Sequence, residues 1–339
     1  MSWVTSIKLM RNLPVFGFKM LLAWSVLSLS ALALPAQEPI LDLSAVRAKA
    51  DQGDSKAQNS MGLAYKFGRG VPADPTAAAA WFQKSADQGD PAGQRNLAQL
   101  YAEGQGVKQD FAESLKWLHK SADQNFASAQ NLLGMFYLNG VGMPADVNEA
   151  IKWLRKAADS GNAEAQNNLA DLYLAGRGLE KNYAEALIWL RKAVDQDCAP
   201  AQATLGWMYA EGVGVKQDPV MAVELFRKSA NQRYASAQHQ LGMMYEKGQG
   251  VPQDYKEAAV WYRVSAERDY GGAQNCLAIL CAKGQGVPQD DVEACVWFAL
   301  AEKHGDKNGA DLRAALTQKL TPEQKAVVEK RVKEFVAKP

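Results

Sequence analysis

Side chains that could do acid–base or metal chemistry are few and widely spaced. The sequence has three histidines, His119, His239 and His304, and none forms the closely spaced helical pair that binds a metal ion. It also has no Gly-x-Ser-x-Gly turn, which would present a nucleophilic serine. We therefore predict no catalytic residue, no metal site and no cofactor.

Gly-x-Gly pairs recur seven times and superficially resemble phosphate-binding loops. The first is Gly68-Arg69-Gly70 and the last is Gly284-Gln285-Gly286. Phosphate-binding loops of this kind follow a strand, whereas each of these pairs follows a segment with helical spacing. We interpret them as turns in which glycine ends a helix and adopts positive φ.

Two of the four cysteines could form a disulfide. Cys281 ends one predicted helix and Cys295 lies early in the next, so an antiparallel helical hairpin could bring them within bonding range in an oxidising compartment. The alternative is a pair of buried thiols that replace tyrosine and alanine. We predict at most one disulfide, between Cys281 and Cys295.

The segments that carry these residues repeat every 36 residues. A tyrosine column and a gap-free glutamine column show the period, and tryptophan fills a third column in six of seven positions. The columns are Tyr65, Tyr101, Tyr137, Tyr173, Tyr209 and Tyr245; Gln58, Gln94, Gln130, Gln166, Gln202, Gln238 and Gln274; and Trp81, Trp117, Trp153, Trp189, Trp261 and Trp297. Seven copies in phase predict a repeat architecture.

Each copy has the pattern of two helices. Ala57, Met61 and Tyr65 share one face of the first helix, and Asp74-Pro75 supplies an N-cap acid followed by proline at the first position of the second. A single helix pair cannot bury both of its apolar faces, so the pairs must stack. The predicted fold is an all-α solenoid of helix pairs.

The repeats leave three other segments, giving four predicted regions. Residues 1–36 carry Lys8, Arg11 and Lys19, then an apolar run and small residues, which is typical of a cleaved secretory signal; an uncleaved membrane anchor is the alternative. Residues 37–54 predict an N-terminal capping helix, 55–306 the seven repeats and 307–339 C-terminal capping helices. We therefore expect the protein in the periplasm or secreted.

The charge balance disfavours a nucleic-acid partner. The chain has 38 Lys and Arg against 37 Asp and Glu, whereas binding to phosphates normally needs a basic excess. Basic pairs such as Arg155-Lys156 and Arg191-Lys192 do recur along the second helices. Acidic residues run along the same helices, so a solvated, ion-paired surface is the favoured interpretation.

One repeat carries a family resemblance. The string Leu133-Gly134-Met135-Phe136-Tyr137, then Gly140-Val141-Gly142, Asp146, Ala150, Trp153 and Lys156-Ala157-Ala158, resembles the Sel-1-like repeat, a relative of the tetratricopeptide repeat. The resemblance implies a right-handed α/α superhelix whose concave side binds a protein or peptide. Some cysteine-rich relatives bind β-lactams, but this chain lacks their paired cysteines.

The binding face is predicted by removing the residues that the scaffold needs. On the first helix the columns of Ala57, Gln58, Met61, Gly62 and Tyr65 are nearly constant, so the opposite face, which includes columns 59 and 63, is free to vary. Its amide, methionine and aromatic side chains suit contacts with a peptide. The predicted residues are Asn59, Leu63, Arg95, Gln99, Asn131, Met135, Asn167, Asp171, Trp207, His239, Met243 and Asn275.

Together these patterns predict a monomeric, non-catalytic adaptor or scaffold of the cell envelope. It binds a protein or peptide, does not bind nucleic acid, and contacts a membrane only if the signal segment stays uncleaved. An Asn column could instead bond between neighbouring helices. The alternative functions are a cell-wall or β-lactam-directed hydrolase, and an anchored component of a polysaccharide-export or motor complex.

Overall fold

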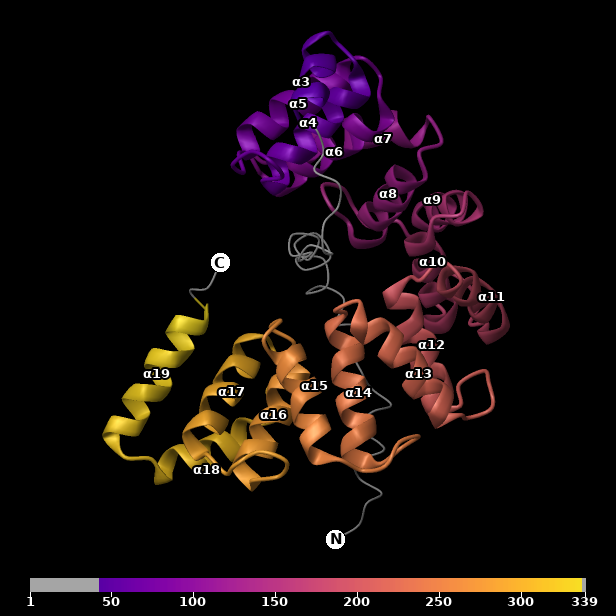
Figure 1. Ribbon diagram of the computed structural model, residues 1–339. Coiled ribbons are helices and arrows are strands. Elements are labelled where there is room, and N and C mark those ends of the chain that lie inside the picture. The colour runs from indigo at the N-terminus through magenta and orange to yellow at the C-terminus, as the bar shows by residue number, and fades with distance from the viewer. Residues whose placement is uncertain (1–42, 337–339) are drawn as a thin grey trace. The chain divides into compact units, whose positions relative to one another are not determined.

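The computed structural model describes residues 43–336, and within this range all regular secondary structure is helical (Figure 1). The helices are α3 Leu43–Asp51, α4 Ser55–Phe67, α5 Pro75–Asp87, α6 Pro91–Glu103, α7 Phe111–Ala122, α8 Ala127–Asn139, α9 Val147–Asp159, α10 Ala163–Ala175, α11 Tyr183–Val194, α12 Ala199–Glu211, α13 Pro219–Asn231, α14 Ala235–Lys247, α15 Tyr255–Ala266, α16 Gly271–Lys283, α17 Asp291–Lys303, α18 Ala310–Lys319 and α19 Pro322–Val336. The predicted signal segment, 1–36, lies outside the described residues.

Helices α4 to α17 form seven consecutive pairs, each a first helix followed by a second helix. In six of these pairs the two helices are seen to pack against each other, as α4 does with α5 and α16 with α17. Helix α3 packs on α4, and α18 and α19 pack on α17. The all-α fold of stacked helix pairs is confirmed. The chain divides into two compact units, residues 1–165 and 166–339, which are described separately.

Capping residues set the ends of the helices. At the start of six of the second helices the predicted acid or asparagine accepts hydrogen bonds from two backbone N–H groups, as Asp74 does from Thr76 and Ala77; at α17, Asp290 accepts one, from Glu293. At the end of α4, Gly68 has φ 66°, in the left-handed region that glycine reaches without steric cost. The predicted caps and helix-ending glycines are therefore present.

In most of the loops the second glycine is needed for close packing. A Cβ added at Gly106, where φ is 69°, would lie 2.0 Å from the Pro75 carbonyl oxygen. Gly250 approaches Pro219, and Gly286 approaches Tyr255, in the same way. The loop thus rests on the start of the preceding second helix, which explains the Gly-x-Gly pattern without a phosphate ligand.

The glutamine column ties each repeat to the one before it. Gln58 Nε2 donates to the Ala50 carbonyl (3.1 Å), and Gln58 Oε1 accepts from Gln88 Nε2 (2.6 Å). Gln238 makes the first of these bonds to Ala230 (3.1 Å). A serine column adds a second tie, since Ser85 Oγ donates to the Ser55 carbonyl (2.8 Å). Gln58 and Ser85 are thus satisfied within the scaffold, whereas Gln238 Oε1 is buried with no donor among the described residues.

The second helices carry a series of lysine–tryptophan contacts. The ammonium groups of four lysines lie 4.1 to 4.3 Å from the ring centroids of the tryptophans three residues earlier in the chain; the pairs are Lys84 and Trp81, Lys120 and Trp117, Lys156 and Trp153, and Lys192 and Trp189. Acidic residues pair nearby, as Glu149 does with Lys152 (2.5 Å). This arrangement fits a solvated, ion-paired surface.

The two cysteines of the predicted disulfide, Cys281 and Cys295, are free thiols. Cys281 and Cys295 are both buried, and Cys295 Sγ lies 3.7 Å from Thr317 Oγ1 of α18. The disulfide considered from the sequence is therefore not formed in the structure. The two thiols instead belong to the apolar core of α16, α17 and the capping helices, which is the alternative arrangement.

Candidate binding surface on the first helices

We call the positions equivalent to 59 and 63 in each repeat the predicted binding face. In the first unit it lies where neighbouring first helices approach each other. In the first unit α4 contacts α6, and α6 contacts α8. Asn96 Nδ2 of α6 donates to Asn59 Oδ1 of α4 (2.8 Å). One part of the amide column therefore does bond between adjacent helices, as the alternative interpretation expected.

Arg95 occupies this face in the first unit. Its Nη1 donates to Asn96 Oδ1 (3.0 Å) and to Gln99 Oε1 (2.8 Å), while Nε is buried and has no acceptor among the described residues. Burial lowers the pKa of the guanidinium, and the negative charges of Glu164 and Glu103 oppose this shift. The guanidinium of this half-buried residue thus makes hydrogen bonds to neutral amides only.

Lys66 and Glu103 complete this cluster. Lys66 Nζ lies 4.0 Å from Glu103 Oε2, and their side chains are only 14% and 9% exposed. Gln99 Nε2 donates to Glu103 Oε1 (2.6 Å). Burial lowers the pKa of Lys66, against the pull of Glu103. We call Asn59, Lys66, Arg95, Asn96, Gln99 and Glu103 the inner polar cluster; it holds two cations and one carboxylate.

In the second unit the same face carries a half-buried acid. Asp171 accepts one hydrogen bond, from Asn167 Nδ2 (3.3 Å), and forms no ion pair among the described residues. Burial raises the pKa of Asp171 to about 7, and Asn167 only partly offsets this. Burial also raises the pKa of Tyr234 to about 12, with a contribution from Asp171. Asp171 is therefore an acid whose ionised form no cation of the described chain stabilises.

His239 and Cys276 also lie together in the second unit, but not in a reactive state. Cys276 Sγ lies 3.6 Å from His239 Nε2, and the rings of Tyr262 and Tyr270 pack around the imidazole. Burial lowers the pKa of His239 to about 4 and raises that of Cys276 to about 12. A neutral imidazole beside a protonated thiol is not the thiolate–imidazolium pair of a cysteine nucleophile.

The predicted residues differ in exposure. Trp207 is exposed (38%), and most of the others are half-buried, with Leu63 and Met243 packed on the apolar core. Gln99, Asn167 and Asn275 are buried. Asn275 lies beneath the turn before α18, because a Cβ on Gly309 would come within 2.5 Å of its Oδ1. The structure thus brings Asn59, Arg95 and Gln99 into one cluster and encloses Asn275.

Lys66 and Glu103 were missed from the sequence, although one signal pointed to the column of Lys66. Position 66 of the repeat holds alanine or leucine in five copies; these are Ala102, Leu138, Leu174, Ala210 and Ala282. The exceptions are Lys66 in the first unit and Glu246 in the second. Glu246 accepts a hydrogen bond from the buried Tyr262 hydroxyl (2.5 Å). A charged residue at a repeat position that is otherwise apolar was therefore the signal that could have identified Lys66.

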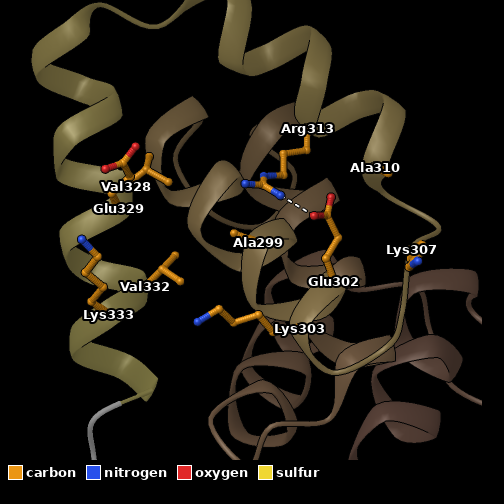
Figure 2. Close-up of a pocket in the computed structure, with 10 residues that line it drawn as sticks. All are labelled: Ala299, Glu302, Lys303, Lys307, Ala310, Arg313, Val328, Glu329, Val332 and Lys333. Carbon is orange, nitrogen blue, oxygen red and sulfur yellow. Dashed lines mark hydrogen bonds and ion pairs between the residues drawn. The ribbon is translucent and has the colours of Figure 1, made fainter.

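The C-terminal helices enclose a separate hollow of about 730 Å³, shown in Figure 2. Ala299 of α17 and Val328 and Val332 of α19 form its apolar walls, and Arg313 of α18 pairs with Glu302 across one side. None of the predicted binding residues lines it. The hollow lies among the capping helices and is distinct from the predicted binding face.

Two further searches concern metal ions and membranes. Among residues 43–336, no group of three or more His, Cys, Asp or Glu side chains is arranged to hold a metal ion. Over the same range, no helix combines the length and apolar character needed to cross a bilayer.

Stacked helix pairs of constant length, with constant packing columns and a variable face, define a helical-repeat protein. Seven consecutive segments, 55–90, 91–126, 127–162, 163–198, 199–234, 235–270 and 272–306, match the Sel1 repeat. The chain belongs to the Sel1 repeat family.

Solved structures agree with this assignment. A protective antigen of uropathogenic Escherichia coli with an SLR fold is 35% identical and has a TM-score of 0.71; the match covers 88% of this chain and 64% of that protein. A Sel1 repeat protein from Oxalobacter formigenes is 32% identical, with a TM-score of 0.61 and coverage of 87% and 86%. Yeast Tom70, at 14% identity and TM-score 0.50 over 86% of this chain and 61% of its own, shares the fold alone. A comparison with curated protein sequences finds no match.

Proposed function

We propose that the protein is a non-catalytic scaffold that binds a protein or peptide partner along the predicted binding face. One observation carries this proposal: the face half-buries Arg95 and Asp171, and neither side chain has an ion-pair partner in the described chain. Buried charges normally are paired, because desolvation is costly. A partner that presents the missing charges gives these residues a role that the fold does not.

The proposed location is the cell envelope or the exterior of the cell. The composition of residues 1–36 supports export, and the related Escherichia coli protein is described as a protective antigen, which fits an exported protein. Of the alternative functions, a hydrolase is less well supported, because the His239 and Cys276 pair is held in an unreactive protonation state.

Affinity purification tests this function. C-terminally tagged protein is recovered from lightly cross-linked cell envelope, and wild type is compared with Arg95→Ala and Trp207→Ala by mass spectrometry. Arg191→Gln serves as the control, since Arg191 is an exposed residue of a second helix. A thermal melt of each variant shows whether it is folded.

We expect wild type and Arg191→Gln to retain the same partner, and folded Arg95→Ala and Trp207→Ala to lose it. If the same proteins remain with all four chains, the predicted binding face is not the binding surface. If wild type retains no protein, the scaffold function is wrong, and turnover of muropeptides and of a chromogenic β-lactam becomes the next assay.

A further inference from the structure

We propose that Arg95 binds a carboxylate of the partner polypeptide and that this is the anchoring contact of the first unit. The inference rests on the proposed scaffold function and adds the chemistry of the bound group. It is carried by the hydrogen-bond geometry of the guanidinium and by the charge of the inner polar cluster.

Only one nitrogen of the Arg95 guanidinium, Nη1, is seen to donate hydrogen bonds. Nη1 makes both hydrogen bonds, to Asn96 Oδ1 at 3.0 Å and Gln99 Oε1 at 2.8 Å. Nε is buried without an acceptor, although a buried donor normally has one. Arginine binds carboxylates through parallel N–H···O hydrogen bonds. The scaffold thus orients this half-buried side chain through Nη1 and gives it no carboxylate partner.

The charges around Arg95 favour an anion. The inner polar cluster buries Lys66 and Arg95 against Glu103 alone, and Glu103 is closer to Lys66, at 4.0 Å, than to the guanidinium, which reaches it through Gln99. Glu164 acts on Arg95 electrostatically but is exposed and forms no ion pair with it. A partner carboxylate would balance the second buried cation.

The repeat scaffold itself does not require this arginine. Equivalent positions hold asparagine in four copies, alanine in one and histidine in one, and these copies form the same helix pairs. The long cationic side chain is thus particular to α6. Its amide neighbours hold it in place, because Asn96 is itself fixed by a hydrogen bond to Asn59.

Four pools of immobilised random decapeptides test the inference with the full-length protein. The pools contain or lack Asp and Glu, and each carries either a free C-terminal carboxylate or a C-terminal amide. Retention of wild type is compared with Arg95→Gln, with Arg95→Lys, which keeps the charge but not the forked geometry, and with Arg191→Gln as the matched control.

We expect wild type and Arg191→Gln to be retained at least about tenfold better by pools with carboxylates than by the amidated pool without acidic residues. Arg95→Gln should lose this preference, and Arg95→Lys should keep only part of it. Two of the pools carry only one kind of carboxylate: the pool without Asp and Glu has only the C-terminal carboxylate, and the amidated pool with Asp and Glu has only side-chain carboxylates. Comparing these two pools shows which kind Arg95 binds. Thermal melts should show that Arg95→Gln is folded. If it is not folded, Arg95→Lys takes its place in the test, and a partial loss of its preference for the carboxylate pools supports the inference.

Equal retention of wild type by all four pools would overturn the carboxylate assignment while leaving the scaffold function intact. The same holds if Arg95→Gln keeps the full preference for carboxylates. Failure of every pool to retain wild type counts against both the scaffold function and this inference.

Discussion

In the first unit α6 holds Arg95 between two amide oxygens, whereas in the second unit α10 holds Asp171 beside a single amide nitrogen. Both residues belong to the predicted binding face, yet they bury charges of opposite sign. The cation lies within a cluster of six polar side chains, and the acid is nearly alone. Burial consequently moves the pKa of Asp171 into the physiological range, while Arg95 keeps its charge.

The packing columns do not differ between the units in this way. Gln88 donates to Gln58 (2.6 Å) in the first unit, and Gln232 donates to Gln202 (2.9 Å) in the second. The scaffold therefore repeats its bonds while the binding face reverses its charge. Opposite charges on identical packing indicate that the hydrogen bonds of the scaffold do not determine which residues occupy this face.

The largest expected effect comes from Asp171. A raised folded-state pKa means that the folded chain holds this proton more tightly than the unfolded chain, so the free energy of unfolding falls as pH rises from about 4 to about 7, and is level above that. A shift from 3.8 to about 7 corresponds to at most roughly 4 kcal/mol. Asp171→Asn should remove this dependence and be more stable than wild type at pH 8.

Urea unfolding at pH 4.5 and at pH 8 measures the difference between the two chains. Asp159→Asn is the control, because Asp159 is exposed at the end of α9. If the free energy of unfolding changes equally for wild type and Asp171→Asn between the two pH values, Asp171 is solvated like a surface acid. The proposed difference between Asp171 in the second unit and Arg95 in the first would then be wrong.

Glu103 should give the next largest effect. Glu103→Gln leaves Lys66 and Arg95 as two buried cations with no buried acid, and we expect a loss of about 2 kcal/mol in the free energy of unfolding. The double variant Lys66→Met/Glu103→Gln, which also removes the cation closest to Glu103, should recover part of that loss. Unfolding by urea at pH 7 measures both.

Glu113→Gln supplies the comparison for that measurement. Glu113 pairs with Lys116 on the outer surface of α7, where both side chains are well exposed, so its removal should change stability by no more than about 0.5 kcal/mol. Similar losses for Glu103→Gln and Glu113→Gln would show that the inner polar cluster is solvated.

Arg95 should matter less for stability than Glu103, although the two belong to one cluster. Arg95→Gln removes a buried charge that has no ion-pair partner, and we expect the free energy of unfolding to change by no more than about 1 kcal/mol. A loss well above 2 kcal/mol in thermal or urea unfolding would mean that the guanidinium is a packing element of α6 and not a group kept for a ligand.

The fold could be predicted from the sequence because the period is carried by residues that bond to the backbone of the neighbouring repeat. Gln58 and Ser85 each need a particular carbonyl, and Gly106 must lack a side chain, so the same types recur in phase. Local spacing also sufficed for the caps, since Asp74 bonds within its own helix.

The binding face was predictable only as a set of positions. Arg95 and Asp171 were found because their columns vary, but their burial depends on side chains from other helices, such as Lys66 and Tyr234. Comparing equivalent positions of the repeats could not show that the turn at Gly309 covers Asn275, because the capping helices are not part of the 36-residue repeat. Those contacts are set by tertiary packing.

Trp207 should have the smallest effect on stability and a large effect on binding. It is 38% exposed on the predicted binding face of α12, whereas Trp189 of α11 is 7% exposed and packed in the same unit. Trp207→Ala should change the free energy of unfolding by about 0.5 kcal/mol or less, and Trp189→Ala should cost about 3 kcal/mol. Retention of the cross-linked partner should follow the reverse order, because an exposed aromatic anchor contributes mainly to binding. If Trp207→Ala instead unfolds as easily as Trp189→Ala, its ring belongs to the core, and Asp171 would be left as the main feature of this face in the second unit.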